Sequence, residues 1–375
     1  MSKIYPSIDA DGLLEYSVVF TDRSLNHMSP KFQAVMRELH AGMTQVYGAS
    51  SCVIVPGGGT FAMESVARQF TREHRVLVVR NGWFSYRWSQ IFETGVSPTA
   101  LEIAQAIPDT PHADQQFSPV DCASVCERIR ALKPEVVVAP QVETSAGLLL
   151  PDAYLKTVAD CAHEVGAVMV LDCVAAGTLW VDMTAIGIDV LITAPQKGWS
   201  STPCAGLVML SDRGLERLQA TQSDSFALDL KKWHSIMGAY LNGGHAYHAT
   251  LPTDGLAQLL DTYHEMARVG FDELKHRQIR MGQAARELLE NHGFKSLAAA
   301  PYQASTVVVS HTDRDDIQSG AAFRDVGLQV AAGVPLACGE SEHFKTFRIG
   351  LFGLDKLMHE ARTLDLLQDA LDRLA

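Results

Sequence analysis

The segment 168–199, VMVLDCVAAGTLWVDMTAIGIDVLITAPQKGW, contains two short apolar runs, Val168–Leu171 and Val190–Thr193. Continuous runs of Val, Ile and Leu of this length are typical of strands that are buried on both faces of a parallel sheet. Asp172 ends the first run, and Lys197 follows the second after a short turn. The residues between them suffice for one helix and one strand. We therefore expect Asp172 and Lys197 at the ends of neighbouring or nearby strands.

The same alternation of apolar runs and helical patterns extends through the first two thirds of the chain. Further strands are predicted at Cys52–Val55, Val76–Val79, Val136–Ala139 and Leu207–Leu210. Helical spacing of apolar residues occurs near Pro30–Tyr47, Phe61–Thr71, Ser85–Thr94, Ala123–Leu132 and Ala153–Val165. This alternation predicts an α/β fold with a mostly parallel sheet between helices.

The pattern changes in the last third of the chain. Long helices are predicted from about Asp254 to His292, apolar runs occur at Thr306–Ser310 and Phe347–Leu351, and a last helix is predicted from about Leu354 to Leu374. This arrangement indicates a smaller α+β unit. We predict an amino-terminal segment 1–30, a large domain 31–260 and a small carboxyl-terminal domain 261–375.

Composition excludes several classes of protein. The chain has 375 residues, of which 47% are hydrophobic and 20% charged, so it can form a large core. Its net charge of -12 provides no overall attraction for nucleic acid or an anionic membrane, and we expect neither as a partner. No apolar run is long enough for a transmembrane helix, and the first residues lack an apolar signal region, so a cytoplasmic location is expected.

The cysteine pattern favours free thiols. There are seven cysteines, an odd number, and no pair forms C-x-x-C. Several lie in apolar stretches, such as Cys52 before Val53–Val55. We therefore expect buried thiols in a reducing compartment, with neither a disulfide framework nor a structural metal site.

A glycine-rich stretch, Pro56–Ala62, follows the first predicted strand and precedes a helix. The backbone N–H groups of Gly58, Gly59 and Thr60 at this helix start suit a phosphate. The stretch also fits G-x-G-x-x-A, but no acidic residue ends the next strand, as a dinucleotide site requires. A plain turn between strand and helix is the third interpretation.

Two further strand ends carry side chains that a planar ligand could use. Trp83 and Phe84 follow Val76–Arg80, and either ring could stack on a cofactor, although aromatic residues at this position are more often part of a core. Ser145 lies in Glu143–Gly147, where its hydroxyl could face a ligand or form a turn or a helix cap.

Together these groups match the requirements of pyridoxal phosphate. A lysine in an apolar setting has a lowered pKa and can form a Schiff base, and a buried carboxylate requires a cationic partner such as the protonated pyridine nitrogen. An aromatic ring can cover the cofactor, and helix N–H groups can hold its phosphate. Lys197, Asp172, the aromatic pair and the glycine-rich stretch supply one group for each requirement.

The residues resemble the class V aminotransferases of pyridoxal phosphate fold type I, in particular the alanine–glyoxylate and serine–pyruvate branch. The resemblance covers residues 26 to 374, and the motifs that carry it are Pro56–Glu64, Glu143–Gly147, Leu171–Val174, Gln196–Gly198, Tyr247–Pro252 and Phe347–Gly350. It implies a large domain with a seven-stranded sheet of mostly parallel strands and a smaller carboxyl-terminal domain.

The resemblance also implies a role for each matching residue. Lys197 would bind the cofactor covalently and carry protons, and Asp172 would pair with the pyridine nitrogen. The remaining cofactor contacts would come from Gly58, Gly59, Thr60 and Gln196 at the phosphate, Phe84 at the ring face, and Ser145 near the ring hydroxyl. Tyr247 and Thr250 would reach the phosphate site of the other subunit in a homodimer, and Arg348 would bind the substrate carboxylate.

The resulting hypothesis is an aminotransferase that moves the amino group of a small amino acid, such as alanine or serine, to glyoxylate or pyruvate in two half-reactions. The first alternative is a 2-aminoethylphosphonate–pyruvate aminotransferase, for which Arg23 and Arg87 are candidate additional cations. A more remote alternative is a cysteine desulfurase-like lyase that uses Cys338. The last alternative is a binding protein without enzymatic activity.

Overall fold

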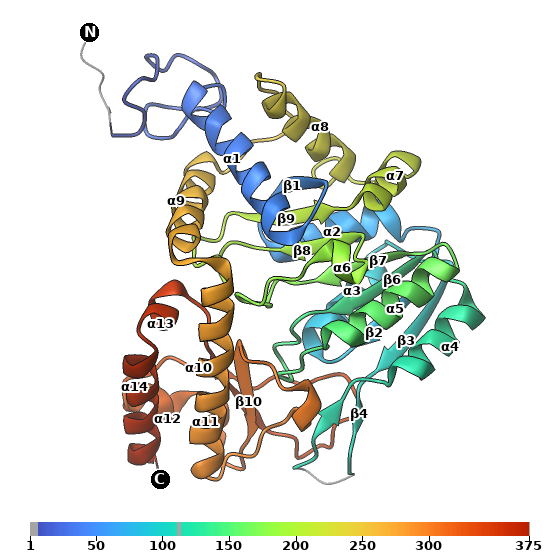
Figure 1. The fold of residues 1–375 in the computed structure, drawn as a ribbon, viewed down its shortest axis with the longest axis vertical. Helices are drawn as coiled ribbons and strands as arrows, with labels where there is room; N and C mark the ends of the chain where they lie inside the picture. Colours follow the sequence, from blue (N-terminus) through green and yellow to red (C-terminus); the bar gives the residue numbers. More distant parts are fainter. Residues whose placement is uncertain (1–6, 111–113, 375) are drawn as a thin grey trace.

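The computed structural model describes residues 7–110 and 114–374, and within them a seven-stranded sheet forms the centre of the molecule (Figure 1). The strands lie in the order β1–β9–β8–β7–β6–β2–β3. Their bounds are β1 Ser51–Pro56, β2 Arg75–Arg80, β3 Ala100–Gln105, β6 Val136–Pro140, β7 Val168–Asp172, β8 Val190–Thr193 and β9 Ala205–Leu210. The runs predicted from the sequence supply six of these strands.

Most neighbouring strands in this sheet are parallel, as predicted. β8, β7, β6, β2 and β3 run in one direction, and β9 runs antiparallel to both β8 and β1. In register, Pro140 lies beside Asp172 and Asp172 beside Ile192. The carboxyl ends of β6, β7 and β8 therefore meet at one edge of the sheet, which is where ligands bind in folds of this kind.

Helices cover both faces of the sheet (Figure 1). Those of the first two thirds are α1 Pro30–Tyr47, α2 Gly59–Phe70, α3 Trp83–Glu93, α4 Cys122–Leu132, α5 Asp152–Glu164, α6 Met183–Ile186, α7 Asp212–Ala220 and α8 Leu230–Leu241. A short hairpin, β4 Ile107–Pro108 with β5 Phe117–Ser118, lies outside the sheet. The buried faces of these elements join with the strands in one large apolar core.

The last third of the chain forms a three-stranded antiparallel sheet, β10–β12–β11, with helices against it. The elements are α9 Thr253–Val269, α10 Phe271–Asn291, η1 Ala300–Tyr302, β10 Val307–His311, α11 Asp315–Gln318, α12 Ala321–Asp325, β11 Ala331–Ala332, β12 Thr346–Gly350, α13 Leu354–Met358 and α14 Glu360–Leu374. The predicted last helix is thus two helices that are interrupted at His359. The predicted domain boundary at 260/261 falls inside α9, and the division into domains stays a prediction.

The strand of the central sheet that the sequence did not predict is β3, Ala100–Gln105. Its sequence, ALEIAQ, has no continuous apolar run, because it forms the edge of the sheet and only Ala104 is fully buried. An edge strand that faces solvent does not need the apolar pattern of its buried neighbours.

The expectation of free thiols is wrong for two of the seven cysteines. Cys126 of α4 and Cys161 of α5 form a disulfide, with Cα atoms 5.7 Å apart. The helices α4 and α5 pack against one another, and this packing brings the two thiols together although they are 35 residues apart in sequence. A count of cysteines cannot show which helix faces will meet. The other five are free, and Cys52, Cys173 and Cys338 among them are buried.

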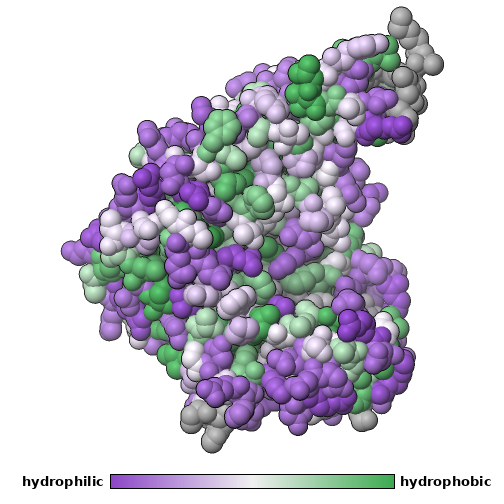
Figure 2. All heavy atoms as spheres, turned by 180° about the vertical axis from the view of Figure 1, so that it is seen from behind, coloured by the Kyte–Doolittle hydropathy of each residue, from purple (hydrophilic) through white to green (hydrophobic). Residues whose placement is uncertain are grey.

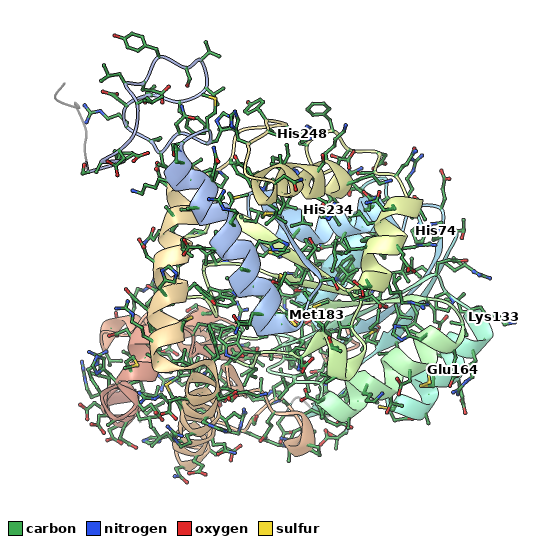
Figure 3. All side chains as sticks on the ribbon, turned by 45° about the horizontal axis from the view of Figure 1, so that its top comes forward. His74, Lys133, Glu164, Met183, His234 and His248 are labelled. Carbon is green, nitrogen blue, oxygen red and sulfur yellow. A yellow bond between two sulfur atoms is a disulfide. The ribbon has the colours of Figure 1, made fainter. Side chains whose placement is uncertain are left out.

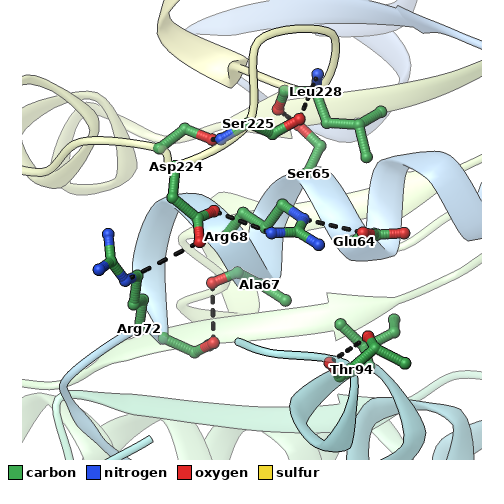
Figure 4. Close-up of polar contacts among 12 residues, drawn as sticks. Glu64, Ser65, Ala67, Arg68, Arg72, Thr94, Asp224, Ser225 and Leu228 are labelled. Atoms are coloured by element: carbon green, nitrogen blue, oxygen red, sulfur yellow. Dashed lines mark hydrogen bonds and ion pairs between the residues drawn. The ribbon is translucent and has the colours of Figure 1, made fainter. Parts of the chain in front are cut away.

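Ion pairs and hydrogen bonds hold α2 against the segment that precedes α8 (Figure 4). Arg68 lies between Glu64 at 2.8 Å and Asp224 at 3.0 Å. The hydroxyl of Ser65 donates to the carbonyl of Leu228 at 2.8 Å. These contacts fix the position of α2, and its first residues follow directly on the glycine-rich turn.

In residues 7–110 and 114–374, no helix has both the length and the apolar character that a membrane crossing requires. The same described residues contain no group of three or more His, Cys, Asp and Glu side chains that could hold a metal ion.

Candidate active site

Asp172 and Lys197 lie at the carboxyl edge of the sheet, at the ends of the neighbouring strands β7 and β8. Asp172 is the last residue of β7, and Lys197 lies in the tight turn that follows β8. A Cβ atom on Gly198 would lie 2.2 Å from the carbonyl oxygen of Gly177, so this turn can form only with glycine at that position. The ring of Trp199 is buried, and its centroid lies 4.7 Å from that of Trp180 with the two ring planes tilted by 38°, which anchors the turn in the core.

The carboxylate of Asp172 is buried and poorly satisfied. Its residue is 8% exposed, and its Oδ1 accepts one hydrogen bond, from the N–H of Val174 at 3.1 Å. Burial raises the pKa of Asp172 to about 6, against the opposing effects of the Val174 N–H and the charge of Lys197. A buried carboxylate of this kind is strongly stabilised by a cation that reaches it.

The amine of Lys197 has no hydrogen bond or ion pair within the described residues. Its Nζ lies 5.6 Å from the ring centroid of Phe84 and 5.6 Å from that of Phe352. Burial lowers the pKa of Lys197; the charge of Asp172 opposes this shift and that of Arg348 adds to it. A lowered pKa increases the fraction of neutral amine, which is the form that attacks a carbonyl carbon.

The ring of Phe84 is surrounded by cationic groups from three parts of the chain. The Cζ atom of Arg87 lies 5.3 Å from the ring centroid, that of Arg348 lies 5.6 Å from it, and Lys197 is the third cation. Arg348 is held in β12 by a hydrogen bond from its Nε to the carbonyl of Ala332. The structure thus brings Lys197, Phe84 and Arg348 together.

The start of α2 lies at the same site. The α2 N-cap is Gly58, which offers no side-chain capping bond, and a Cβ atom on Gly58 would meet no heavy atom within 4 Å. Thr60 accepts a hydrogen bond at its Oγ1 from Nη1 of Arg87 at 3.0 Å. Open backbone N–H groups beside an arginine form a favourable site for a phosphate. Gln196, also expected at the phosphate, is exposed.

A second carboxylate at this edge, Glu143, was not assigned a role from the sequence. Glu143 is fully buried and accepts five hydrogen bonds: from the N–H of Phe84, from the N–H and hydroxyl of Ser85, and from the N–H and hydroxyl of Ser145. It therefore caps the first turn of α3, which carries Phe84. The sequence signal that could have indicated this role was the acid immediately before the Thr144-Ser145 pair.

Ser145 is part of this buried network. Its Oγ donates to Glu143 at 2.7 Å and accepts from the N–H of Trp83 at 2.8 Å. A Cβ atom on Gly82 would lie 2.2 Å from the same Oγ, which shows how closely α3 approaches this loop. The contact between Ser145 and a ring hydroxyl stays a prediction.

Tyr247 and Thr250 lie on the surface, in the segment between α8 and α9. Their hydroxyl oxygens are 3.2 Å apart, and Tyr247 is 54% exposed. Figure 3 shows the neighbouring His248 at the outer edge of the molecule beside α8, where its Nε2 lies 2.7 Å from the carbonyl oxygen of Phe226. Within the described residues, neither Tyr247 nor Thr250 makes a hydrogen bond or ring contact to the groups around Phe84.

Cys338 is poorly suited to nucleophilic chemistry. It is 2% exposed, and the backbone N–H groups of its loop are held by the carboxylate of Glu340. Burial raises the pKa of its thiol to about 12. A reactive cysteine requires an accessible, electropositive position that favours the thiolate, so the geometry disfavours the lyase alternative.

These residues fit pyridoxal phosphate. Asp172 is a buried carboxylate that needs a cation, and the amine of Lys197 has no partner. The N–H groups at the start of α2 are uncapped beside Arg87. Each of these groups is matched by one part of the cofactor: the protonated pyridine nitrogen, the aldehyde carbon and the phosphate.

Known proteins give the same assignment. The family model of the class-V aminotransferases matches residues 12–353. The chain is 29% identical over 314 residues to a 2-aminoethylphosphonate–pyruvate transaminase of Pseudomonas aeruginosa, and the alignment covers 82% of this chain and 78% of that protein. It is 30% identical over 342 residues to a protein of the same name from Paraburkholderia phymatum, and this alignment covers 88% of this chain and 84% of that protein.

Solved structures share the fold. Alanine–glyoxylate aminotransferase of Nostoc sp. superposes with a TM-score of 0.77 at 23% identity, over 93% of this chain and 88% of that one. Pyridoxamine–pyruvate aminotransferase of Mesorhizobium loti superposes with a TM-score of 0.74 at 17% identity, over 96% and 88%. The fold is therefore that of the pyridoxal phosphate enzymes of fold type I, and the chain belongs to the class-V aminotransferases, with pyridoxal phosphate as its cofactor.

Proposed function

We propose that this enzyme transfers the amino group of 2-aminoethylphosphonate, or of a closely similar ω-amino phosphonate, to pyruvate. The sequence alone had favoured alanine or serine as donor and named the phosphonate donor as the alternative. The relatives at 29–30% identity carry the name of the phosphonate enzyme, which favours the alternative. Alanine–glyoxylate aminotransferase is a relative in fold at lower identity.

The observation that carries the proposal is the pair of arginines around Phe84, Arg87 and Arg348, because Lys197 is bound to the cofactor. A phosphonate carries more negative charge than a carboxylate and has one more oxygen acceptor, so it gains more from a site with several cations. Of the two additional cations suggested by the sequence, Arg87 lies at this site. Arg23 lies on the exposed amino-terminal segment.

Arg348 is the proposed ligand of the acidic group of both substrates. Burial lowers the pKa of its guanidinium, with Glu143 opposing, yet an arginine stays charged at neutral pH. Its Nε is occupied by Ala332, and its two Nη atoms form the planar fork that suits two oxygens of one anion. Since the two half-reactions use one site in turn, the phosphonate of the donor and the carboxylate of pyruvate bind the same arginine.

The cofactor, when bound, supplies an electron sink for the carbon from which a proton is removed. Lys197 holds it covalently at rest, and the free amine of Lys197 then moves the proton. Asp172 keeps the pyridine nitrogen protonated, Phe84 covers the ring, and Gly58, Gly59, Thr60 and Gln196 hold the phosphate. The roles of these residues are part of the proposal.

The proposal includes a homodimer with shared sites. The residues of largest apolar exposure cluster on the amino-terminal segment, with Leu13 at 95%, Tyr16 at 91% and Val18 at 101%. Figure 2 shows hydrophobic side chains on the surface next to the amino-terminal end. Apolar side chains exposed to this degree favour contact with another protein surface. In a dimer through this surface, Tyr247 and Thr250 would be free to reach the partner's phosphate site.

A panel of donors and acceptors tests the proposed substrates. We expect the pyridoxal form to convert to the pyridoxamine form faster, in kcat/KM, with 2-aminoethylphosphonate than with alanine or serine, and pyruvate to reverse the conversion. Arg348→Met should raise the KM for the phosphonate and for pyruvate by about tenfold or more, because each loses a charge-assisted hydrogen bond.

Three results would contradict the proposal. Alanine or serine with glyoxylate as the best pair would return the assignment to the first hypothesis. Release of sulfide from cysteine that is lost in Cys338→Ala would favour the lyase. An increase of KM for only one of the two substrates in Arg348→Met would show that the substrates do not share this arginine.

A further inference from the structure

A cavity of about 380 Å³ lies away from the cluster around Phe84. It is bounded by one face of α10, by the segment that leads into α5, and by the loop around Ala304. One residue of its lining, Gln141, donates its N–H to the backbone carbonyl of Asp172. In the described structure, no lining residue makes a hydrogen bond or ring contact with Lys197 or Phe84. Its volume is in the range of small-ligand sites, about 300–1,000 Å³.

One face of α10 supplies the cationic side of this cavity. Lys275, Ile279, Gln283 and Arg286 all line it, and their spacing of three and four residues places them on one face of the helix. A Cβ atom on Gly282 would lie 2.4 Å from atoms of Ser305, so α10 packs directly on the loop that closes the cavity.

Arg286 is a buried cation that has no ion-pair partner among the described residues, although the charge of Glu290 acts on it from farther away. The residue is 8% exposed, its Nη1 donates to Oγ of Ser296 at 2.9 Å, and its Nη2 donates to the carbonyl of Ala304. Both acceptors are neutral, and in the described residues no carboxylate lies within ion-pair distance and no group accepts a bond from its Nε. A buried charge without a counter-ion is costly, and an anion in the cavity would offset that cost.

Two further groups of the lining favour an anion. Lys275 is partly exposed and makes no hydrogen bond or ion pair with any described residue. The helix α5 begins at Asp152 after Pro151, both of which line the cavity, and no side chain caps its first N–H groups. A helix start of this kind attracts negative charge. Asp152 is the single acid in the lining, against the two cations Lys275 and Arg286.

We propose that this cavity is a second ligand site of the enzyme, which binds a small oxyanion between Lys275, Arg286 and the start of α5. The rest of the lining combines apolar side chains, among them Leu149, Leu179 and Ile279, with the amides of Gln141, Gln283 and Gln303. The apolar part of this lining suits a short aliphatic body attached to the anionic group. A phosphoryl, phosphonate or carboxylate group could accept hydrogen bonds from the same donors, and the competition experiment below distinguishes these anionic groups.

The test is equilibrium dialysis of labelled inorganic phosphate against the holoenzyme at low ionic strength, where such contacts are least screened. We expect the wild-type protein to bind one phosphate per chain. Lys275→Met should bind this phosphate at least about tenfold more weakly, or not at all. Lys275 has no bonded partner among the described residues, so we expect its replacement to leave the fold intact. Lys232→Met on α8 removes the same charge outside the cavity and is the matched control.

Asp152→Asn gives a second and opposite effect. Removal of the single acidic charge from the lining should strengthen phosphate binding by about fivefold. Competition then identifies the anion: displacement of phosphate by methylphosphonate but not by propionate indicates a phosphorus oxyanion, and displacement by propionate indicates a carboxylate. Equal binding by wild type, Lys275→Met and Lys232→Met would overturn the proposal, as would an Asp152→Asn variant that binds phosphate no more strongly.

Discussion

Two carboxylates lie at the same edge of the sheet, and they differ in how completely the protein satisfies them. Glu143 follows β6 and accepts five hydrogen bonds from α3 and its own loop. Asp172 ends the neighbouring strand β7 and accepts one. Both are buried. The protein therefore bears the cost of desolvation for both, but it recovers that cost internally only for Glu143.

This difference separates groups that shape the site from groups that are available to a ligand. The bonds of Glu143 end on the backbone of Phe84 and Ser85, so its charge holds the first turn of α3 in place. Asp172, Lys197 and the two Nη atoms of Arg348 keep unused hydrogen-bonding capacity, and Lys197 and Arg348 lie beside the ring of Phe84. Unsatisfied buried groups are characteristic of sites that a ligand completes.

The largest expected effect is that of Lys197→Ala, which removes the amine with no partner. We expect turnover to fall by at least about 10³-fold, because both the covalent attachment and the proton transfer are lost. The unfolding free energy of the protein without cofactor should not decrease, since Lys197 makes no bond there. Borohydride reduction and peptide mapping check the assignment. A reduced cofactor attached to another lysine would contradict it.

The next effect is that of Asp172→Asn on the rate. An amide cannot keep the pyridine nitrogen protonated, so the proton-removal step should slow by about 10²- to 10³-fold, while the binding of the cofactor phosphate persists. Single-turnover kinetics with a saturating donor measures this step. A half-reaction of near-normal rate in Asp172→Asn would show that Asp172 does not contact the ring nitrogen.

The same substitution predicts a pH effect on the protein without cofactor. The pKa of Asp172 is raised from 3.8 to about 6 on folding, so the folded state holds this proton more tightly than the unfolded state does. Its contribution to stability is therefore lost as the pH rises from about 4 to about 6, by about 3 kcal/mol in total. Asp172→Asn should remove this dependence.

Denaturant unfolding at pH 4 and pH 8 tests this prediction. The stability of Asp172→Asn relative to wild type should be about 2–3 kcal/mol more favourable at pH 8 than at pH 4. Added cofactor should stabilise the wild type more than the variant, since it brings the cation that Asp172 lacks. A difference that does not change with pH would mean that the carboxylate is satisfied in the folded protein.

The sequence predicted the residues with unused capacity better than the residues that support them. Asp172 and Lys197 were found because a charged residue next to a buried strand is visible in the sequence itself. Phe84 and Arg348 were found through motifs. The role of Glu143 depends on where the start of α3 lies relative to the loop after β6, and that relation between distant segments is absent from any local pattern.

Other features were missed for related reasons. The edge strand β3 has no apolar run because one side of it faces solvent. The disulfide between Cys126 and Cys161 depends on the packing of α4 against α5, which cysteine spacing does not reveal. Arg286 lies on the long helix α10, where an arginine is expected to face solvent. Only the fold shows that it is buried and has no ion-pair partner among the described residues.

A smaller effect is expected for Glu143→Gln, which keeps the shape of the satisfied carboxylate. The new amide group would face donors, so at least one buried N–H or hydroxyl loses its acceptor, which costs about 1–3 kcal/mol of unfolding free energy. The turnover number should also fall, because Phe84 shifts. Glu102→Gln, on the exposed edge strand β3, is the matched control and should change stability by less than about 0.5 kcal/mol. Equal stability of the two variants would show that Glu143 is not the cap of α3.

The smallest expected effects are those of Tyr247→Phe and Thr250→Ala. These two residues lie at the surface, and neither makes a hydrogen bond or ring contact with Glu143 or Asp172 in the described structure. If these hydroxyls bind the phosphate in the partner's site, each variant should weaken cofactor binding by about 0.5–3 kcal/mol, as measured by titration of the protein without cofactor.

Complementation separates a shared site from a local one. Hybrids form between Lys197→Ala chains and chains changed at both Tyr247 and Thr250. With shared sites, one site of each hybrid carries both defects and the other carries neither, so activity returns to about half of that of a wild-type dimer. With local sites, each site keeps one defect and no activity returns, and a fully active monomer would exclude the shared site altogether.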